Sequence, residues 1–245
     1  MDSASQFGKG PLIELCGLSL AFGQRQLLTD ANACFGAGLL VALLGRNGSG
    51  KSTLLRAMAG LNRHYTGRIL AGGNNLQRLH AAEQARMMSF VGTGRARVER
   101  FTCYDLVALG RAPYTNWIGS LGDSDRRAVD SALDAVGMQD YARRQLDSLS
   151  DGECQRVMIA RALAQDTPMI LLDEPTSFLD IPNRYGLVRL LASLAHERGK
   201  CVIYSTHELD IALELSDSIM LIDPPRLLCG APADMRPAIS SAFGL

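Results

Sequence analysis

A glycine-rich stretch in the first quarter of the chain has the residues that a phosphate-binding loop needs. It fits the pattern G-x-x-x-x-G-K-[ST] and reads Gly45-Arg46-Asn47-Gly48-Ser49-Gly50-Lys51-Ser52-Thr53. In such a loop the glycines let successive backbone N–H groups turn toward phosphate oxygens, and the start of the following helix adds its positive end. Lys51 would reach the β- and γ-phosphates, and the Ser52 hydroxyl would bind Mg²⁺. The stretch therefore predicts a site for a nucleoside triphosphate with Mg²⁺.

A second stretch ends in two acids that would complete this site. Residues 169–172 are an apolar run of the strand type, and Asp173 and Glu174 follow it directly. We expect Asp173 to hold Mg²⁺, directly or through water, and Glu174 to accept a proton from the attacking water. Two acids at a strand end are common on solvated sheet edges, so this interpretation depends on the phosphate loop.

The elements that must position these residues alternate along the chain. Buried-strand patterns occur at residues 38–44, 87–91, 168–172, 201–205 and 218–222, and helical periodicity at 51–59, 123–136, 153–164, 183–196 and 209–215. This alternation predicts an α/β fold with a parallel sheet and helices on its faces. Shorter strand patterns at 12–15, 18–20, 29–35 and 67–70 indicate an antiparallel sheet near the N-terminus. The long interval between 91 and 168 predicts a helical subdomain, at about residues 93–165, inserted into a single domain of residues 1–245.

Composition excludes several other classes of protein. The 245 residues include 25 Lys and Arg against 25 Asp and Glu, so no net positive field attracts nucleic acid, and we expect no nucleic-acid partner. No apolar run approaches the roughly 18 residues that a membrane span needs, and the first residues lack the pattern of a signal peptide. The six cysteines include no C-x-x-C pair, which argues against a zinc site. We therefore expect a protein of the cytosol.

The stretch Leu149-Ser150-Asp151-Gly152-Glu153 precedes a predicted helix and carries a specific resemblance. Ser150 and Glu153 fit a capping box, which would create a second helix N-terminus able to bind an anion. The five residues resemble the L-S-G-G-Q signature of ABC-type ATPases, and the resemblance extends over about residues 12–229. It implies a P-loop nucleoside triphosphatase fold, with a RecA-like parallel sheet core, an N-terminal antiparallel β subdomain and an inserted helical subdomain.

Further motifs of that family match single positions. Ser177-Phe178-Leu179-Asp180 resembles the D-loop, whose Asp180 would belong to the nucleotide site. His207 resembles the switch histidine that contacts the γ-phosphate, and Phe22 resembles the aromatic residue that stacks on adenine. The resemblance implies ATP and Mg²⁺ as cofactors. It also implies that His207 is catalytic together with Lys51 and Glu174.

The resemblance further implies how the chain assembles. Two copies would form a homodimer packed head to tail, with each ATP between the phosphate loop of one chain and Ser150 and Gly152 of the other. ATP binding would close this dimer and hydrolysis would release it.

Three positions depart from the family pattern. Asp151 stands where glycine is usual and Glu153 where glutamine is usual. Because Ser150 and Gly152 are retained, we expect Asp151 to point away from the nucleotide or to weaken closure modestly. Thr93 stands where the family places a glutamine after a strand, since Gln84 lies upstream in a helical stretch.

Residues 104–114 resemble a stretch found in the ATPases of iron–siderophore, haem and cobalamin importers. This implies a subunit that hydrolyses ATP at the cytoplasmic face of the inner membrane. It would be bound peripherally to separate permease subunits and served indirectly by a substrate-binding protein. The alternatives are a soluble or regulatory ABC ATPase that is not coupled to transport, and an ABC transporter ATPase for another substrate. A small-molecule kinase or GTPase with the same phosphate loop would not account for residues 149–153 or for His207.

Overall fold

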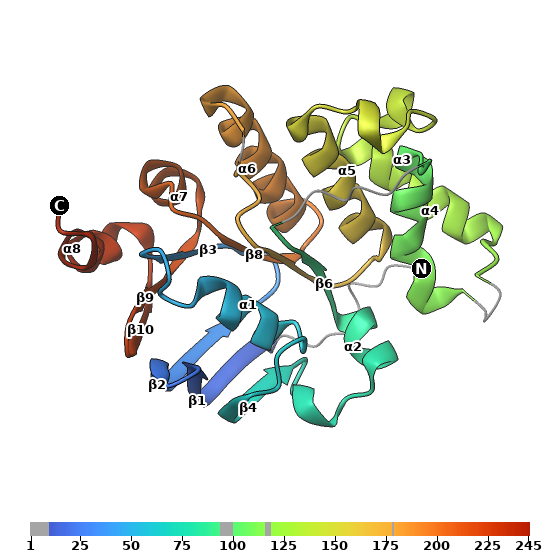
Figure 1. Cartoon of the computed structure of the whole chain (residues 1–245). Helices are drawn as coiled ribbons and strands as arrows, with labels where there is room; N and C mark the ends of the chain where they lie inside the picture. Colours follow the sequence, from blue (N-terminus) through green and yellow to red (C-terminus); the bar gives the residue numbers. More distant parts are fainter. Residues whose placement is uncertain (1–9, 94–99, 116–118, 178) are drawn as a thin grey trace.

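The computed structural model describes residues 10–93, 100–115, 119–177 and 179–245. A six-stranded sheet in the order β10-β9-β3-β8-β7-β6 runs through the middle of the molecule (Figure 1). Its strands are β3 (Leu40–Gly45), β6 (Met88–Val91), β7 (Met169–Leu172), β8 (Cys201–Ser205), β9 (Ser218–Asp223) and β10 (Arg226–Gly230). Every neighbouring pair is parallel except β9 with β10. The predicted parallel sheet is therefore confirmed, with one antiparallel strand at its edge.

A second sheet of antiparallel strands lies below the first in Figure 1. Its order is β2-β1-β4-β5, with β1 (Ile13–Phe22), β2 (Arg25–Phe35), β4 (Tyr65–Ala71) and β5 (Asn74–Asn75). The two short strands predicted at 12–15 and 18–20 are a single strand, β1, whose pairing register with β2 shifts between Leu15 and Leu18. Such a bulge interrupts the alternation of buried side chains, which is why the pattern reads as two pieces.

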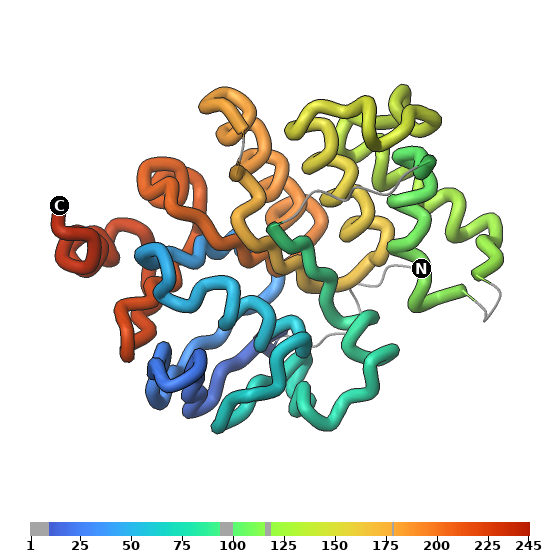
Figure 2. The backbone as a smooth tube through the Cα atoms, in the orientation of Figure 1, coloured from blue at the N-terminus to red at the C-terminus, as the bar shows by residue number. Residues whose placement is uncertain are grey.

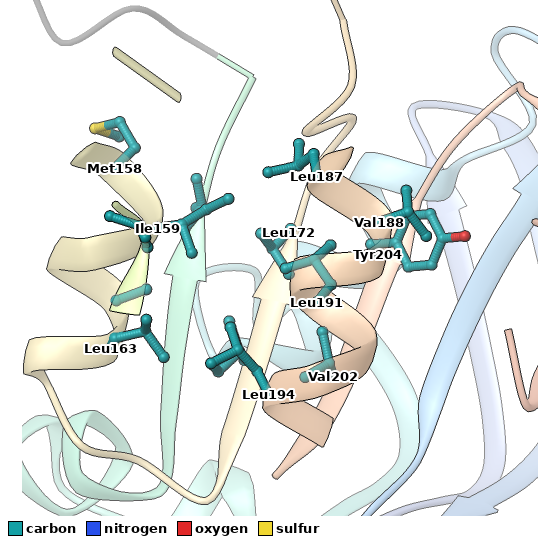
Figure 3. Packing of buried hydrophobic residues seen from close by; sticks show 14 of the residues in the cluster. Met158, Ile159, Leu163, Leu172, Leu187, Val188, Leu191, Leu194, Val202 and Tyr204 are labelled. Atoms are coloured by element: carbon teal, nitrogen blue, oxygen red, sulfur yellow. The ribbon is translucent and has the colours of Figure 1, made fainter. Parts of the chain in front are cut away.

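Alternate side chains of the central strands point to opposite faces of the sheet and supply two hydrophobic cores. Leu40, Ala42 and Leu44 of β3 belong to the larger core, and Val41 and Leu43 belong to the smaller one. The smaller core is closed by the four-stranded sheet and by α1 (Lys51–Met58). The larger core is closed mainly by α5 (Asp151–Ala164) and α6 (Ile181–His196); in Figure 3 the apolar side chains of α6 lie against β7 and β8, and those of α5 lie on the side of β6. The sheet is thus covered on both faces, as its continuous apolar strands require.

The helices that come between β6 and β7 in the sequence gather at one side of the molecule. They are α3 (Cys103–Ala108), α4 (Asp123–Ala135) and α5, with the short 3₁₀ turns η3 (Leu109–Tyr114), η4 (Gln139–Tyr141) and η5 (Leu146–Ser148). We call this group the helical lobe; Figure 2 shows it at the opposite side from α8 (Pro232–Phe243). The remaining helices are α2 (Ala81–Met87), α7 (Leu209–Leu215) and the 3₁₀ turn η2 (Leu76–Arg78). Among the described residues, no helix combines the length and the apolar character that crossing a bilayer requires.

Two long helices begin slightly earlier than periodicity predicts, because capping residues fix their first turns. Ser150 caps α5, and its hydroxyl accepts a hydrogen bond from the backbone N–H of Glu153. Asp180 caps α6 in the same way, and Pro182 occupies the first turn.

A buried ion pair joins three elements of the helical lobe. Arg111 of η3 donates from Nε to Asp125 Oδ1 of α4 at 2.9 Å, and from Nη1 to the carbonyl of Ala164 at 2.7 Å. Its guanidinium also lies over the ring of Tyr114, 4.1 Å from the centroid. The hydrogen bond from Arg111 holds the pKa of Asp125 below its usual value. One arginine thus joins η3, α4 and the C-terminal end of α5.

Replacing Asp125 by asparagine is expected to lower the free energy of unfolding by about 2 kcal/mol at pH 7, because it removes a charge-assisted hydrogen bond from a buried pair. Because the pKa of Asp125 is lower in the folded protein than its value of 3.8 in the unfolded chain, its ionised form stabilises the fold at pH values above 3.8. That contribution to stability is lost as the pH falls from 3.8 through the lower pKa that Asp125 has in the folded protein. Urea unfolding should therefore give a constant difference between the two proteins from pH 7 to about 5, and a shrinking one below 3.8.

The matched control is Asp123→Asn, because Asp123 is an exposed residue of the same first turn of α4. This variant should lose no more than about 1 kcal/mol of unfolding free energy, which is the size of a favourable interaction with the helix dipole. Equal losses in the two variants would show that the Arg111 pair adds no stability of its own.

Candidate functional site

Three loops meet at one edge of the six-stranded sheet because β3, β8 and β7 are neighbours and run parallel. The glycine-rich loop follows β3, Asp173 and Glu174 follow β7, and His207 comes two residues after β8. The carboxyl ends of parallel strands are the usual place for ligand sites in such sheets. The topology therefore brings together residues that are far apart in the sequence, such as Ser52 and Asp173, which are 121 positions apart.

The glycine-rich loop has a backbone that side chains would obstruct at two positions. Gly50, which precedes α1, has φ 105°, and a Cβ there would lie 2.8 Å from a methyl carbon of Leu27. A Cβ on Gly45 would lie 2.4 Å from Ser49 Oγ. Glycine at both positions lets the loop fold tightly over the end of β3 and lead into α1. The N-terminus of α1 then faces the space where the predicted phosphates would bind.

Lys51 is the buried cation of this loop. Its side chain is only 6% exposed; Nζ donates to the carbonyl of Gly45 at 2.9 Å and lies 3.8 Å from Glu174 Oε1. Burial lowers the pKa of Lys51, and the carboxylates of Glu174 and Asp173 oppose that shift. The ammonium group is thus held at the mouth of the loop, against the acids that follow β7.

Asp173 is buried, and its two carboxylate oxygens have different surroundings. Oδ1 accepts hydrogen bonds from Ser52 Oγ and from Ser205 Oγ, each at 2.9 Å. Oδ2 is buried and has no hydrogen-bond partner among the residues that the structure describes. A buried carboxylate oxygen without a partner is costly unless a ligand completes it. The Asp173 carboxylate and the Ser52 hydroxyl that bonds to it form a donor set of the hard oxygen type that Mg²⁺ prefers, so these residues fit the predicted metal.

Glu174 has a backbone conformation that is uncommon for a residue other than glycine. Its φ is 48°, in the left-handed region. The backbone N–H of Glu174 donates to Ser205 Oγ at 2.8 Å, and Ser177 Oγ donates to Glu174 Oε2 at 3.3 Å. This geometry turns the side chain toward Lys51 and the glycine-rich loop. Non-glycine residues in this region often occur at functional sites.

Lys51, Ser52 and Glu174 border a cavity of about 490 Å³, which is within the range of small-molecule sites, whereas Asp173 is not among the lining residues. Phe22 lies at its rim with 72% of its surface exposed. The remaining lining residues are Arg25, Leu27, Asn47, Gly48, Gly50, Lys51, Ser52, Thr53 and Glu174. Sequence reasoning missed Arg25 and Leu27. Arg25 is opposite Phe22 where β1 turns into β2, so the hairpin that places Phe22 at the rim also places Arg25 there.

Other predicted residues lie outside this cavity. His207 is half exposed, and its Nε2 lies 3.2 Å from Glu208 Oε1, a carboxylate that also pairs with Arg184. Ser150 donates its backbone N–H and its hydroxyl to Glu153 Oε2, each at 2.8 Å, and Asp180 caps α6. None of these residues, nor Gly152, contributes to the cavity lining within the part of the chain that the structure describes.

Gln84 and Thr93, the two residues considered for the family's glutamine position, lie in different surroundings. Gln84 lies within α2 and is buried; its amide donates to the carbonyls of Leu76 and Leu79 at 2.8 and 3.0 Å. Thr93 is exposed, two residues after the end of β6. Gln84 thus holds η2 against α2. Phe178 of the predicted D-loop lies outside the described residues.

Comparison with known proteins decides the family. The profile of the ABC transporter family matches residues 28–177, a span that contains the glycine-rich loop, residues 149–153 and the acids after β7. The chain belongs to the ABC transporter family. The resemblance inferred from residues 149–153 is therefore confirmed.

Relatives within the ABC transporter family share about a third of their residues with this chain. The cobalamin import ATP-binding protein of Halobacterium salinarum is 36% identical over 90% of this chain. Because the match covers 55% of that protein, the chain spans about half of its length. The iron(3+)-hydroxamate import ATP-binding protein of Bacillus subtilis is 35% identical over 81% of this chain and 74% of its own length. The petrobactin import ATP-binding protein of Bacillus anthracis is 34% identical over 91% and 82%.

Solved structures of ABC transporters have the same fold. A chain from an inward-facing structure of a metal-chelate type ABC transporter matches with a TM-score of 0.85 and 26% identity, covering 96% of this chain and 90% of its own. CbiO1 of Clostridium perfringens, part of the transporter complex CbiONQ, matches with a TM-score of 0.82 and 24% identity, covering 97% and 100%. The predicted P-loop fold of an ABC-type ATPase is thereby confirmed.

Proposed function

We propose that this chain binds ATP with Mg²⁺ and hydrolyses it as the ATP-binding subunit of an ABC importer. The observation that carries the proposal is one cavity in which a buried lysine, a glycine-rich loop and the Glu174 carboxylate meet. Phe22 at the rim would stack on adenine, and the loop with Lys51 would hold the phosphates. Glu174 would accept the proton of the attacking water.

Ser52 and Asp173 are the residues that would hold Mg²⁺. Asp173 Oδ2 is the buried oxygen without a partner, and the Ser52 hydroxyl lies against the same carboxylate. When bound, Mg²⁺ neutralises charge that develops on the triphosphate. The residues of the chain itself orient the phosphates and keep Glu174 in place.

A homodimer would account for the predicted residues that lie outside the cavity. Ser150 and Gly152 stand at the N-terminus of α5, and Asp180 stands at the N-terminus of α6. We propose that these groups complete the nucleotide site of a second copy packed head to tail. His207 would then turn from Glu208 to the γ-phosphate when ATP is bound.

The cargo that we propose is an iron chelate, haem or cobalamin. Relatives that match most of this chain are named as import proteins for cobalamin, iron(3+)-hydroxamate and petrobactin, and this supports the class. The chain would work at the cytoplasmic face of the membrane, bound to permease subunits and served indirectly by a substrate-binding protein.

The importer proposal is tested by uptake in the native host. A strain that lacks this gene should lose uptake of ferric siderophore, haem or cobalamin, each measured separately with labelled compound. Wild-type protein should restore it, and Glu174→Gln, produced at the same level, should not. If uptake of all three compounds were unchanged in the deletion strain, the importer proposal would be rejected for this class of cargo.

A further inference from the structure

Ser205 is a buried hydroxyl at the end of an otherwise apolar strand. It is the last residue of β8 (Cys201–Ser205), and it is completely inaccessible to solvent. A hydroxyl at such a position costs free energy unless it is hydrogen-bonded. Ser205 has two partners, and both belong to the candidate site: the side chain of Asp173 and the backbone of Glu174.

The first bond determines which oxygen of Asp173 is left for a metal. Ser205 Oγ donates to Oδ1 at 2.9 Å, so that Oδ1 receives hydroxyl groups from Ser52 and Ser205 together. With Oδ1 engaged twice, the carboxylate cannot rotate without breaking hydrogen bonds, and Oδ2 stays buried and unpartnered. Ser205 thereby helps to hold the Asp173 carboxylate in one orientation, in which Oδ2 is the oxygen that no hydroxyl group of the described residues engages.

The second bond acts on the backbone of Glu174. The same Ser205 oxygen accepts the Glu174 N–H at 2.8 Å. At φ 48° this peptide is in a conformation that residues other than glycine seldom adopt without support from their surroundings. The hydrogen bond supplies such support, and the conformation directs the Glu174 side chain toward Lys51, whose Nζ is 3.8 Å away.

We propose that Ser205 is a positioning residue for ATP hydrolysis, acting through Asp173 on Mg²⁺ binding and through Glu174 on the attacking water. This inference rests on the proposed function. Ser205 is completely buried and does not line the cavity, so it would act on the nucleotide only through the two acids to which it is bonded. One hydroxyl group sets the geometry of both acids, because it bonds to the side chain of the first and the backbone of the second. Mutation of residues that hydrogen-bond to a metal ligand, without binding the metal themselves, commonly lowers metal affinity or activity by 10- to 100-fold.

The test compares Ser205→Ala with Ser89→Ala. Ser89 is also a buried serine of the central sheet, but its hydroxyl donates to the carbonyl of Met169, at the opposite end of β7 from Asp173. Two measurements are made on each protein. The first is the affinity for a fluorescent ATP analogue, in Mg²⁺ and in EDTA. The second is the hydrolysis rate as a function of ATP and Mg²⁺ concentration.

We expect Ser205→Ala to bind the analogue in EDTA within about twofold of the wild type, since the phosphate loop is unchanged. The Mg²⁺ concentration for half-maximal binding should rise about tenfold, and kcat should fall about tenfold with little change in KM. Ser89→Ala should match the wild type in all of these. If Ser205→Ala does not fold, Ser205→Cys takes its place, because a thiol keeps the shape but donates weakly.

An unchanged Mg²⁺ requirement and kcat in Ser205→Ala would overturn the inference, and so would equal losses in both alanine variants. Wild-type protein that neither binds the analogue nor hydrolyses ATP would instead overturn the proposed function. The two failures are therefore distinguishable within one experiment.

Discussion

Replacing Glu174 by glutamine is expected to slow ATP hydrolysis by about 10²- to 10⁴-fold, the usual contribution of a general base. Glutamine has nearly the same size and can still accept the hydrogen bond from Ser177, but it cannot take a proton from water. Because Glu174 is one wall of the cavity and the phosphate loop is unaltered, ATP affinity should stay within a fewfold of the wild type. Single-turnover hydrolysis and equilibrium binding, measured on the same preparation, separate the two effects.

The control is Glu197→Gln, since Glu197 is an exposed residue at the end of α6, away from the cavity. It should hydrolyse ATP at the wild-type rate. Light scattering on Glu174→Gln should also show a dimer with ATP and a monomer without it, if Ser150 and Gly152 complete the site of a second copy. Wild-type turnover by Glu174→Gln would reject the base, and a monomer with ATP bound would reject the assembly.

Lys51→Ala is expected to weaken ATP binding by about 100-fold, or about 3 kcal/mol, because it removes the buried cation that faces the phosphates. The wild-type lysine is already desolvated, which lowers its pKa, and the carboxylates of Glu174 and Asp173 oppose that shift. It therefore meets the triphosphate with little further loss of hydration. Titration with a fluorescent ATP analogue measures the change.

Lys200→Ala is the matched control for this second prediction. Lys200 is also a lysine whose pKa is lowered by burial, and its Nζ donates to the carbonyl of Thr167 at 2.7 Å. It precedes β8, at the opposite end of the strand from Ser205, so its loss should lower stability and leave nucleotide affinity unchanged. Equal affinity losses in the two variants would mean that unfolding, and not the missing charge, explains the effect.

Features coded by contiguous residues were predictable, and features made by distant residues were not. The glycine-rich loop is a local motif after a fully apolar strand, so both its position and the start of α1 follow from the sequence. Ser205 and Asp173 are 32 positions apart and meet only because β7 and β8 pair in parallel. Arg25 and Leu27 enter the cavity through a hairpin whose register no local pattern specifies.

Two C-terminal elements were missed for a different reason. β10 is an edge strand whose residues are half-buried or exposed, so its pattern is weak. α8 contains Pro237, which normally argues against a helix interior. The starts of α5 and α6 are set by their capping residues, Ser150 and Asp180, and not by the apolar periodicity that locates the rest of each helix.

The anchoring of α5 at its C-terminal end gives that helix the geometry of a lever. Arg111 holds the carbonyl of Ala164, and the neighbouring Gln165 donates to the carbonyls of Ala85 and Met88 at 2.7 and 3.0 Å. Ser150 lies at the other end of α5, about 20 Å away at the usual rise of a helix. A tilt of roughly 10° about the anchored end would move Ser150 by about 4 Å. A small rotation of α5, made together with the helices packed on it, would therefore displace Ser150 by about the width of a phosphate group.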